Sequence, residues 1–305
     1  MRVETGLDGD RLGSAGITIG TFDGVHLAHA EAIRHLLEVS SANGWSTMVI
    51  TFDNHPRRVL DPDHCPHLIT TLDEKLEILD GLGVHTTWVM PFTRELAALG
   101  PDDFMRQVGS RIDIRHLVSG PDFALGHERS GDNAWLADYG RRNGFATEVM
   151  PSLKVDGKEL HSSDIRQLLE AGEVSRAARL LGRPFGLRGA VETGAKIGRR
   201  LGFPTANLAV PPGKLIPADG IYATRVKLPA GEWPGALSIG RRPTFDGERR
   251  VVEVHVLDFS GDLYGVEIAV QVIERLRGQE RYEGIEDLVS QIALDVEETR
   301  RLVAG

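Results

Sequence analysis

The chain has 305 residues, is 41% hydrophobic and 26% charged, and carries a net charge of −9 with a single cysteine, Cys65. One cysteine cannot form an internal disulfide, and no apolar run approaches the roughly 20 residues that cross a bilayer, so no membrane partner is expected. The negative charge argues against a nucleic-acid partner, because polyanions require a concentrated basic face. The first residues lack the apolar core of a signal peptide, which predicts a cytoplasmic protein.

The first half of the chain alternates short apolar runs with helical patterns. The predicted strands are 17–19, 47–52, 87–91, 117–119 and 146–150, and the predicted helices are 30–39, 72–82, 102–108 and 134–142. Such alternation predicts βαβ units and a parallel sheet that is covered on both faces. Ligands of these sheets bind at the carboxyl ends of the strands, near the point where strand order reverses. The turn after the first strand is therefore the first candidate site.

The pattern changes after residue 161. Residues 162–182 are spaced like two short helices interrupted at Ala171-Gly172, and we interpret them as the end of a first domain at 1–182. Period-two runs at 189–193, 221–228, 236–239, 251–259 and 266–273 then predict an antiparallel sheet closed into a small barrel. An apolar stripe from Ile285 to Leu302 predicts a terminal helix packed on that barrel. The second domain is therefore 183–305.

Two histidines stand in the turn after the first predicted strand. His26 and His29 are three residues apart at the start of a helix, so they share a face. A helix N-terminus favours anions, and two imidazoles there can bind a triphosphate and stabilise charge that develops on it. A pair of structural or surface histidines is the alternative that these residues leave open.

A basic stretch runs into a Pro-Thr turn at residues 194–208. Thr205 and Asn207 offer the hard oxygen ligands that Mg²⁺ prefers, and Pro204 restricts the loop that holds them. The preceding glycines and basic side chains can cradle a phosphate. These residues are Gly194, Lys196, Gly198 and Arg199. The alternative is an ordinary turn that leads into a strand.

Glu253 interrupts an otherwise apolar strand pattern. An unpaired carboxylate is costly to bury, so this side chain is expected to have a chemical role or a partner. It could accept the proton of a substrate hydroxyl that attacks a γ-phosphate. An ion pair with Arg241 or Arg242 is the alternative.

Residues 20–29 resemble the Gly-x-Phe-Asp-Gly-x-His-x-Gly-His signature of the nucleotidylyl transferase superfamily, in the form found in bacterial FAD synthetases. Ala28 stands at the second glycine, and further matches at 51–60, 73–75, 120–132 and 161–166 include departures at Ala124, Leu125, His161 and Asp164. The resemblance implies a Rossmann-like nucleotidylyl transferase domain with His26 and His29 as catalytic residues. The nucleotide- and flavin-binding residues that it implies are Gly20, Phe22, Asp23, Gly24, Asp122, Phe123, Arg129, Ser162, Ser163 and Arg166.

Residues 183–303 are similar to riboflavin kinase, including the Gly-Phe-Pro-Thr-Ala-Asn and Glu-Val-His motifs. This resemblance implies a six-stranded antiparallel β-barrel with a terminal helix, in which Thr205 and Asn207 bind Mg-ATP and Glu253 acts on the ribityl 5′-hydroxyl of riboflavin. The binding residues that it implies are Gly194, Lys196, Gly198, Arg199, Phe203, Pro204, Thr205, Asn207 and Arg277.

The order of the two modules resembles that of the bifunctional prokaryotic enzymes. The resemblance implies that the barrel phosphorylates riboflavin to FMN with Mg-ATP and that the first domain adenylylates FMN to FAD. Small-molecule substrates are then the expected partners, and the sequence does not predict an oligomeric state. Two alternatives stay open: a first domain that binds nucleotide or flavin only for regulation, and a transferase with a different substrate.

Overall fold

The computed structural model describes residues 1–193, 198, 201–244 and 247–303. They form two compact units, Met1–Ser162 and Ser163–Gly305. The predicted pair of short helices is confirmed as α7 (Ser162–Glu170) and α8 (Val174–Leu181). Most of α7 and all of α8 belong to the second unit, where α8 packs on β11 and β16. The domain boundary at 182/183 stays a prediction.

The first unit contains a six-stranded sheet in which every neighbouring pair is parallel. The five predicted strands are confirmed, and a short polar strand, β1, adds an edge that its four largely exposed residues did not signal. The order is β1-β4-β3-β2-β5-β8, so strand order reverses between β2 and β5. The strands are β1 (Arg2–Thr5), β2 (Gly13–Ile19), β3 (Ser46–Phe52), β4 (Thr86–Met90), β5 (Ile112–Ser119) and β8 (Ala146–Val149).

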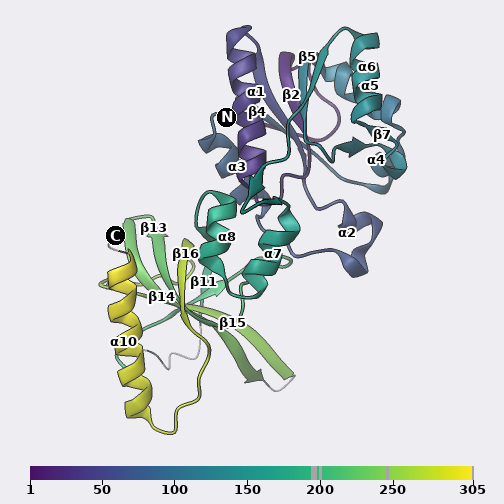
Figure 1. Cartoon of the computed structure of the whole chain (residues 1–305). Helices are drawn as coiled ribbons and strands as arrows, with labels where there is room; N and C mark the ends of the chain where they lie inside the picture. The colour runs from purple at the N-terminus through teal and green to yellow at the C-terminus, as the bar shows by residue number, and fades with distance from the viewer. Residues whose placement is uncertain (194–197, 199–200, 245–246, 304–305) are drawn as a thin grey trace. The chain divides into compact units, whose positions relative to one another are not determined.

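Helices cover both faces of this sheet (Figure 1). Helices α1 and α3 share one apolar cluster with β3, whereas α5 and α6 pack in a larger cluster around Trp88 of β4. The predicted helices are confirmed as α1 (Leu27–Ala42), α3 (Leu72–Gly81), α5 (Pro101–Arg111) and α6 (Asn133–Asn143). Shorter elements are α2 (Arg57–Leu60), η1 (Pro62–His64), α4 (Arg94–Ala98), β6 (Ala124–Leu125), η2 (His127–Arg129), β7 (Gly131–Asp132), β9 (Lys154–Val155) and β10 (Lys158–Glu159).

Local capping explains where several of these helices begin and end. Thr71 and Glu74 form a reciprocal capping box at the start of α3, and Asp132 accepts a hydrogen bond from the Trp135 N–H at the start of α6. Gly144 ends α6 in the left-handed conformation. The α1 N-terminus differs, because no side chain among the described residues caps it.

The second unit is a closed six-stranded antiparallel barrel, as predicted, in the order β11-β12-β15-β14-β13-β16. Alternate side chains fill its interior, among them Val191, Leu208, Leu237 and Val254, each at most 6% exposed. The terminal helix α10 (Ile285–Val303) packs on β13, β14 and β16. The strands are β11 (Phe185–Glu192), β12 (Ala206–Ala209), β13 (Gly220–Leu228), β14 (Gly231–Thr244), β15 (Gly247–Val256) and β16 (Glu267–Arg277).

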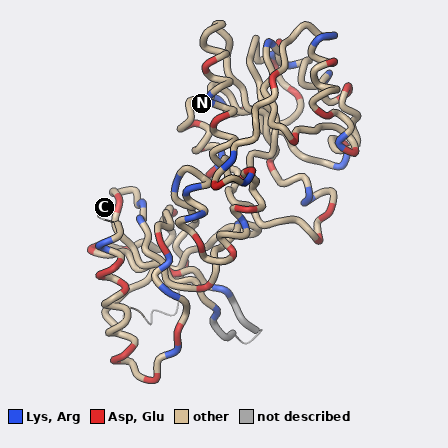
Figure 2. The backbone as a smooth tube through the Cα atoms, viewed as in Figure 1, with Lys and Arg blue, Asp and Glu red and all other residues tan. Residues whose placement is uncertain are grey.

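Lys and Arg residues are interspersed with Asp and Glu along both units (Figure 2). The net charge of the chain is −9. No helix within the described part of the chain is long and apolar enough to cross a membrane. The cytoplasmic location and the lack of a nucleic-acid partner stay predictions.

Two candidate active sites

A cavity of about 870 Å³ lies in the first unit at the carboxyl ends of β2 and β5. The turn after β2 and the turn after β5 both line it, so it opens where strand order reverses. This is the position predicted for a ligand from the alternating sequence pattern. Of the predicted residues, those that line the cavity are Gly20, Phe22, His26, His29, Asp122, Phe123, Arg129 and Ser162.

The turn after β2 is held in a strained conformation. Phe22 and Val25 have φ angles of 48° and 36°, which are unfavourable for residues with a side chain, and for β-branched Val25 above all. Gly24 adopts φ 82°, and a Cβ there would meet the Ile69 side chain at 3.0 Å. Such strain persists only where the surroundings enforce it.

Hydrogen bonds to Asp23 hold much of this turn in place. Its buried carboxylate accepts hydrogen bonds from the backbone N–H groups of Ile69 and Thr70 at 3.1 and 3.0 Å. The Thr70 hydroxyl also accepts a bond from the Gly24 N–H at 3.0 Å. Asp23 and Gly24 therefore anchor the turn to residues 69–70, and neither lines the cavity.

The two histidines stack on each other at the start of α1. The ring centroids of His26 and His29 are 3.7 Å apart, and the rings of Phe22 and His29 form a T-shaped pair with centroids 5.2 Å apart. Burial lowers the pKa of His29 well below its usual range, and the nearby His26 and Lys75 charges act in the same direction. His29 is therefore neutral near pH 7. Its Nδ1 atom has no hydrogen-bond partner among the described residues.

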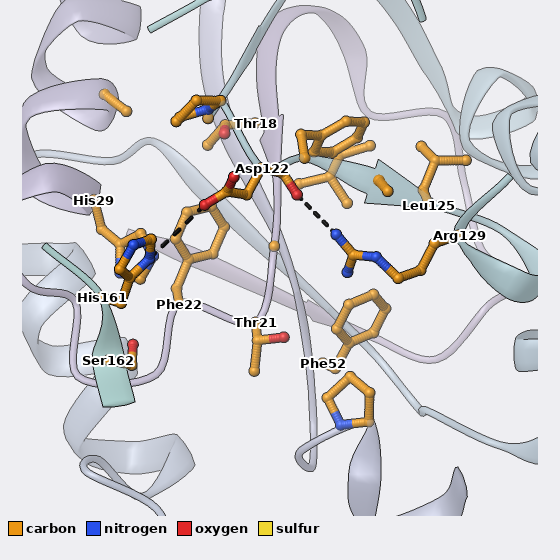
Figure 3. Close-up of a pocket in the computed structure, with 18 of the residues that line it drawn as sticks. Thr18, Thr21, Phe22, His29, Phe52, Asp122, Leu125, Arg129, His161 and Ser162 are labelled. Carbon is orange, nitrogen blue, oxygen red and sulfur yellow. Dashed lines mark hydrogen bonds and ion pairs between the residues drawn. The ribbon is translucent and has the colours of Figure 1, made fainter. Parts of the chain in front are cut away.

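Asp122 and Arg129, from the segment after β5, also line the cavity. The Arg129 guanidinium donates to the Asp122 carbonyl at 2.9 Å, and His161 Nδ1 lies 3.8 Å from the Asp122 carboxylate. Figure 3 shows His29 and His161 on one side of Asp122, and Arg129 and Leu125 on the other. Aromatic and aliphatic side chains from several loops complete the lining, including Phe52, Leu60, Phe92, Phe104 and Phe123.

The predicted Ser-Ser-Asp-Ile-Arg segment is divided between the two units. The Ser162 hydroxyl donates to the Asp23 carbonyl at 3.0 Å. Ser162 therefore belongs to the first unit and supports the histidine turn, the segment 20–29 that carries His26 and His29. Ser163 and Arg166 lie in α7 within the second unit. Ala28, which replaces a glycine of the signature, lines the cavity.

On the barrel, Asn207 and Glu253 are directly opposite each other on β12 and β15. Their neighbours Leu208 and Val254 point into the barrel interior, so Asn207 and Glu253 project from the outer face. Opposite residues of an antiparallel pair have Cβ atoms about 5 Å apart. Glu253 is 9% exposed, as the sequence pattern suggested. The amide and the carboxylate thus form one polar site.

A second neighbour of Glu253 on the outer face is Ser238 of β14. Gln279 donates to the Ser238 hydroxyl at 3.1 Å and to the Ile239 carbonyl at 2.9 Å. Asn207, Glu253 and Ser238 therefore form a row across three strands, and Gln279 caps its end.

The loop before β12 is anchored from both sides. His255, two residues beyond Glu253, lies 2.7 Å through its Nδ1 from the Pro204 carbonyl, and its ring meets the Phe203 ring edge to face at 5.6 Å. The Phe203 N–H donates to the Gly198 carbonyl at 2.9 Å. A Cβ on Gly198 would lie 2.3 Å from the Phe203 carbonyl oxygen. These contacts fix the loop backbone at Thr205, the residue just before β12 begins.

The remaining predicted kinase residues are distributed as follows. The Arg277 guanidinium forms a two-point hydrogen bond with Asp295 of α10, at 3.0 and 2.7 Å, and this pairing raises the pKa of Arg277. Arg241 lies 3.8 Å from the Asp219 carboxylate. Gly194, Lys196 and Arg199 lie outside the described residues.

The oxygen atoms on this face suit Mg²⁺ chemically. Asn207 offers an amide oxygen directly opposite the Glu253 carboxylate, and Thr205, in the loop just before β12, offers a hydroxyl. Hard oxygens of these kinds are the usual protein ligands of magnesium, which commonly retains waters and substrate phosphates as well. The residues present therefore fit this ion.

Sequence reasoning gave no role to Ser238, His255 or Lys75. Ser238 was detectable as the polar residue that faces outward between apolar Leu237 and Ile239. Lys75 was detectable as a cation at a core position of its helix, because Leu72 and Leu79 lie three residues before it and four after it. No signal in the sequence alone indicates that His255 contacts Pro204.

Together, a parallel-sheet unit with a histidine turn over a cavity and a barrel with a paired Asn and Glu define a chain with a nucleotidyl transferase half and a kinase half. The FAD synthetase family model matches residues 10–164, and the riboflavin kinase family model matches residues 181–303. The chain belongs to the bifunctional riboflavin kinase/FMN adenylyltransferase family.

Relatives of that description match nearly the whole chain. The protein of Pseudomonas fluorescens is 35% identical over 289 residues, with 94% of this chain and 92% of the relative covered. That of Escherichia coli K12 is 36% identical over 282 residues, with 92% and 90% covered. A solved structure described as the macrolide-efflux protein of Streptococcus pneumoniae has the same fold, with a TM-score of 0.86, 29% identity and 94% of each chain covered.

Proposed function

We propose that this chain converts riboflavin to FMN in its barrel and FMN to FAD in its N-terminal unit, using one ATP for each step. The observation that carries the proposal is that the proposed catalytic groups of the two steps, His26 and His29 for one and Glu253 for the other, lie in different units. The histidine turn lies at the cavity of the first unit, and Asn207 stands beside Glu253 on the barrel. The two reactions therefore have separate sites.

In the kinase step, the 5′-hydroxyl oxygen of riboflavin attacks the γ-phosphorus of ATP. A new P–O bond forms, the bond to the bridging oxygen breaks, and ADP leaves. Glu253 accepts the hydroxyl proton, and its burial beside Asn207 keeps it in a fixed position. Thr205 and Asn207 would hold Mg²⁺, which neutralises charge on the phosphates when it is bound.

In the adenylyl transfer step, a phosphate oxygen of FMN attacks the α-phosphorus of ATP and pyrophosphate leaves. The α1 N-terminus offers uncapped N–H groups beside His26 and His29, an arrangement that favours an anion. Neutral His29 can donate a hydrogen bond to a phosphate oxygen, and the approach of that anion favours its protonated form. The aromatic side chains that line the same cavity offer an apolar surface for a flavin ring.

An assay of the two steps with purified protein tests this proposal. Given riboflavin, ATP and Mg²⁺, the wild type is expected to form FMN; given FMN instead, it is expected to form FAD and pyrophosphate. His29→Ala should lower FAD formation by roughly 10²-fold or more, because it removes a group that stabilises developing charge, and should leave FMN formation unchanged. His64→Ala is the control, since that side chain is 76% exposed and does not line the cavity.

The same assay separates the alternatives. If the wild type makes FMN from riboflavin but forms neither FAD nor pyrophosphate from FMN, the adenylyl transfer proposal is wrong and a regulatory first unit is supported. Formation of a dinucleotide with CTP or GTP in preference to ATP would instead support a different nucleotide substrate.

A further inference from the structure

Lys75 of α3 is a buried cation beneath the histidine turn. It is 6% exposed, and its ammonium donates three hydrogen bonds. The acceptors are the Thr21 carbonyl at 2.9 Å, the Thr51 hydroxyl at 3.0 Å and the Phe52 carbonyl at 3.2 Å. All three acceptors are neutral, although a buried charge is usually stabilised by a carboxylate within bonding distance. Its location therefore calls for an explanation.

The three acceptors come from the carboxyl ends of two neighbouring strands. Thr21 follows β2, whereas Thr51 and Phe52 end β3, and the Thr51 hydroxyl also donates to the Thr21 carbonyl at 3.2 Å. Thr21 and Phe52 both line the cavity (Figure 3). Lys75 therefore joins two segments of the cavity rim from behind, and it does not line the cavity itself.

Charged groups around Lys75 come from several elements. Asp23 in the histidine turn and Asp53 after β3 favour its protonated form, but burial outweighs them and lowers the pKa of Lys75 to about 8. The Lys75 charge also contributes to lowering the pKa of His29 in α1. The ammonium is thus electrostatically coupled to the base of the predicted triphosphate site.

We propose that Lys75 is a positioning residue for adenylyl transfer: its ammonium fixes the ends of β2 and β3 around the cavity and supplies positive charge behind the histidine turn. This inference rests on the proposed function of the first unit. An anionic triphosphate at the turn stabilises the charged lysine, and the charged lysine stabilises the triphosphate, without direct contact between them.

The test compares Lys75→Met with Lys158→Met in the full chain. The first variant retains the apolar stem and removes the charge and three donors; the second removes the same charge from an exposed site in the same unit. We expect Lys75→Met to lower kcat/KM for ATP in FAD formation at least tenfold at pH 7. Riboflavin phosphorylation in the same molecule and both activities of Lys158→Met should stay within twofold of wild type.

The pH profile distinguishes positioning by charge from a structural role. Lys75 is charged below its pKa, so wild-type kcat/KM for ATP should fall as pH rises through about 8. Lys75→Met should stay at its low level from pH 7 to 9. Unchanged kcat/KM in this variant, or a fall near pH 8 as large as that of wild type, would overturn the inference.

A second variant keeps the inference testable if Lys75→Met does not fold. Arginine does not titrate in this range, so Lys75→Arg should show no fall between pH 7 and 9, and a wild-type fall in this variant would also refute the inference. A wild type that forms no FAD at any pH refutes the proposed function of the unit itself, which is a different result from any of these.

Discussion

Replacing His255 by phenylalanine tests how the loop before β12, here called the kinase loop (residues 198 and 201–205), is positioned. His255→Phe keeps an aromatic ring against Phe203 but removes the hydrogen bond to the Pro204 carbonyl, whose 2.7 Å length marks a close contact. Because Thr205 and Asn207 are one and three residues beyond Pro204, a released carbonyl allows both of these predicted oxygen ligands to move relative to Glu253.

The size of the effect follows from the single bond that is lost. A hydrogen bond of this kind contributes about 0.5–1.5 kcal/mol, which corresponds to a roughly 2- to 13-fold rise in KM for ATP in the kinase reaction. Initial rates of FMN formation at varied ATP measure it, and FAD formation from FMN in the same sample is the internal control. His255→Asn, which retains a side-chain donor, should recover part of the loss.

Wild-type KM and kcat in His255→Phe would refute this reasoning, because the loop would then hold its position without the histidine. A parallel loss of FAD formation would also contradict it, since the contact lies wholly within the barrel unit.

Two further predictions concern the kinase loop and the stability of the first unit. Gly198→Ala forces a Cβ to 2.3 Å from the Phe203 carbonyl oxygen, so FMN formation should fall roughly 10- to 100-fold while FAD formation persists; equal rates in mutant and wild type would show that the loop adapts. Glu148 accepts hydrogen bonds from His35 and His116, chiefly His35, which lower its pKa below the ordinary value of 4.5. These bonds therefore stabilise the folded unit at pH values above 4.5, and this stabilisation is lost as pH falls through the lowered pKa of Glu148. Between pH 5 and pH 3 the melting temperature of Glu148→Gln should consequently drop less steeply than that of wild type.

Much of the fold could be predicted because its signals are local. The apolar runs and helical stripes of the first half identify five of the six sheet strands and all the long helices, and the βαβ alternation indicates where the cavity opens. The short edge strand β1 was not predicted, because its residues are largely exposed and show no alternation of apolar and polar positions. Strand β12 was predicted only as one of two alternatives for its segment, because it is four residues long and begins directly after the Pro-Thr turn.

The strand β12 changes how the Pro-Thr-Ala-Asn segment is understood. The sequence left a magnesium loop and a turn into a strand as alternatives, and the structure contains the turn and the strand. The two interpretations are compatible, because strand pairing is what brings Asn207 opposite Glu253, 46 positions away in the chain. Such register cannot be read from composition or spacing.

The roles of Asp23 and Lys75 also depended on tertiary contacts. Asp23 belongs to a recognisable signature, yet its carboxylate binds the backbone of Ile69 and Thr70 and shapes the turn from behind. A signature identifies which residues belong to a site, whereas their contacts distinguish groups that face a ligand from groups that support the site.

The central claim is that the two transfers occur at separate sites, and Glu253→Gln tests it most directly. The amide keeps the shape of the side chain and removes the base, so FMN formation from riboflavin should fall by about 10²–10⁴-fold. FAD formation by the same purified protein, supplied with FMN and ATP, should match wild type. Loss of both activities in a folded Glu253→Gln protein, or unchanged FMN formation, would contradict the account.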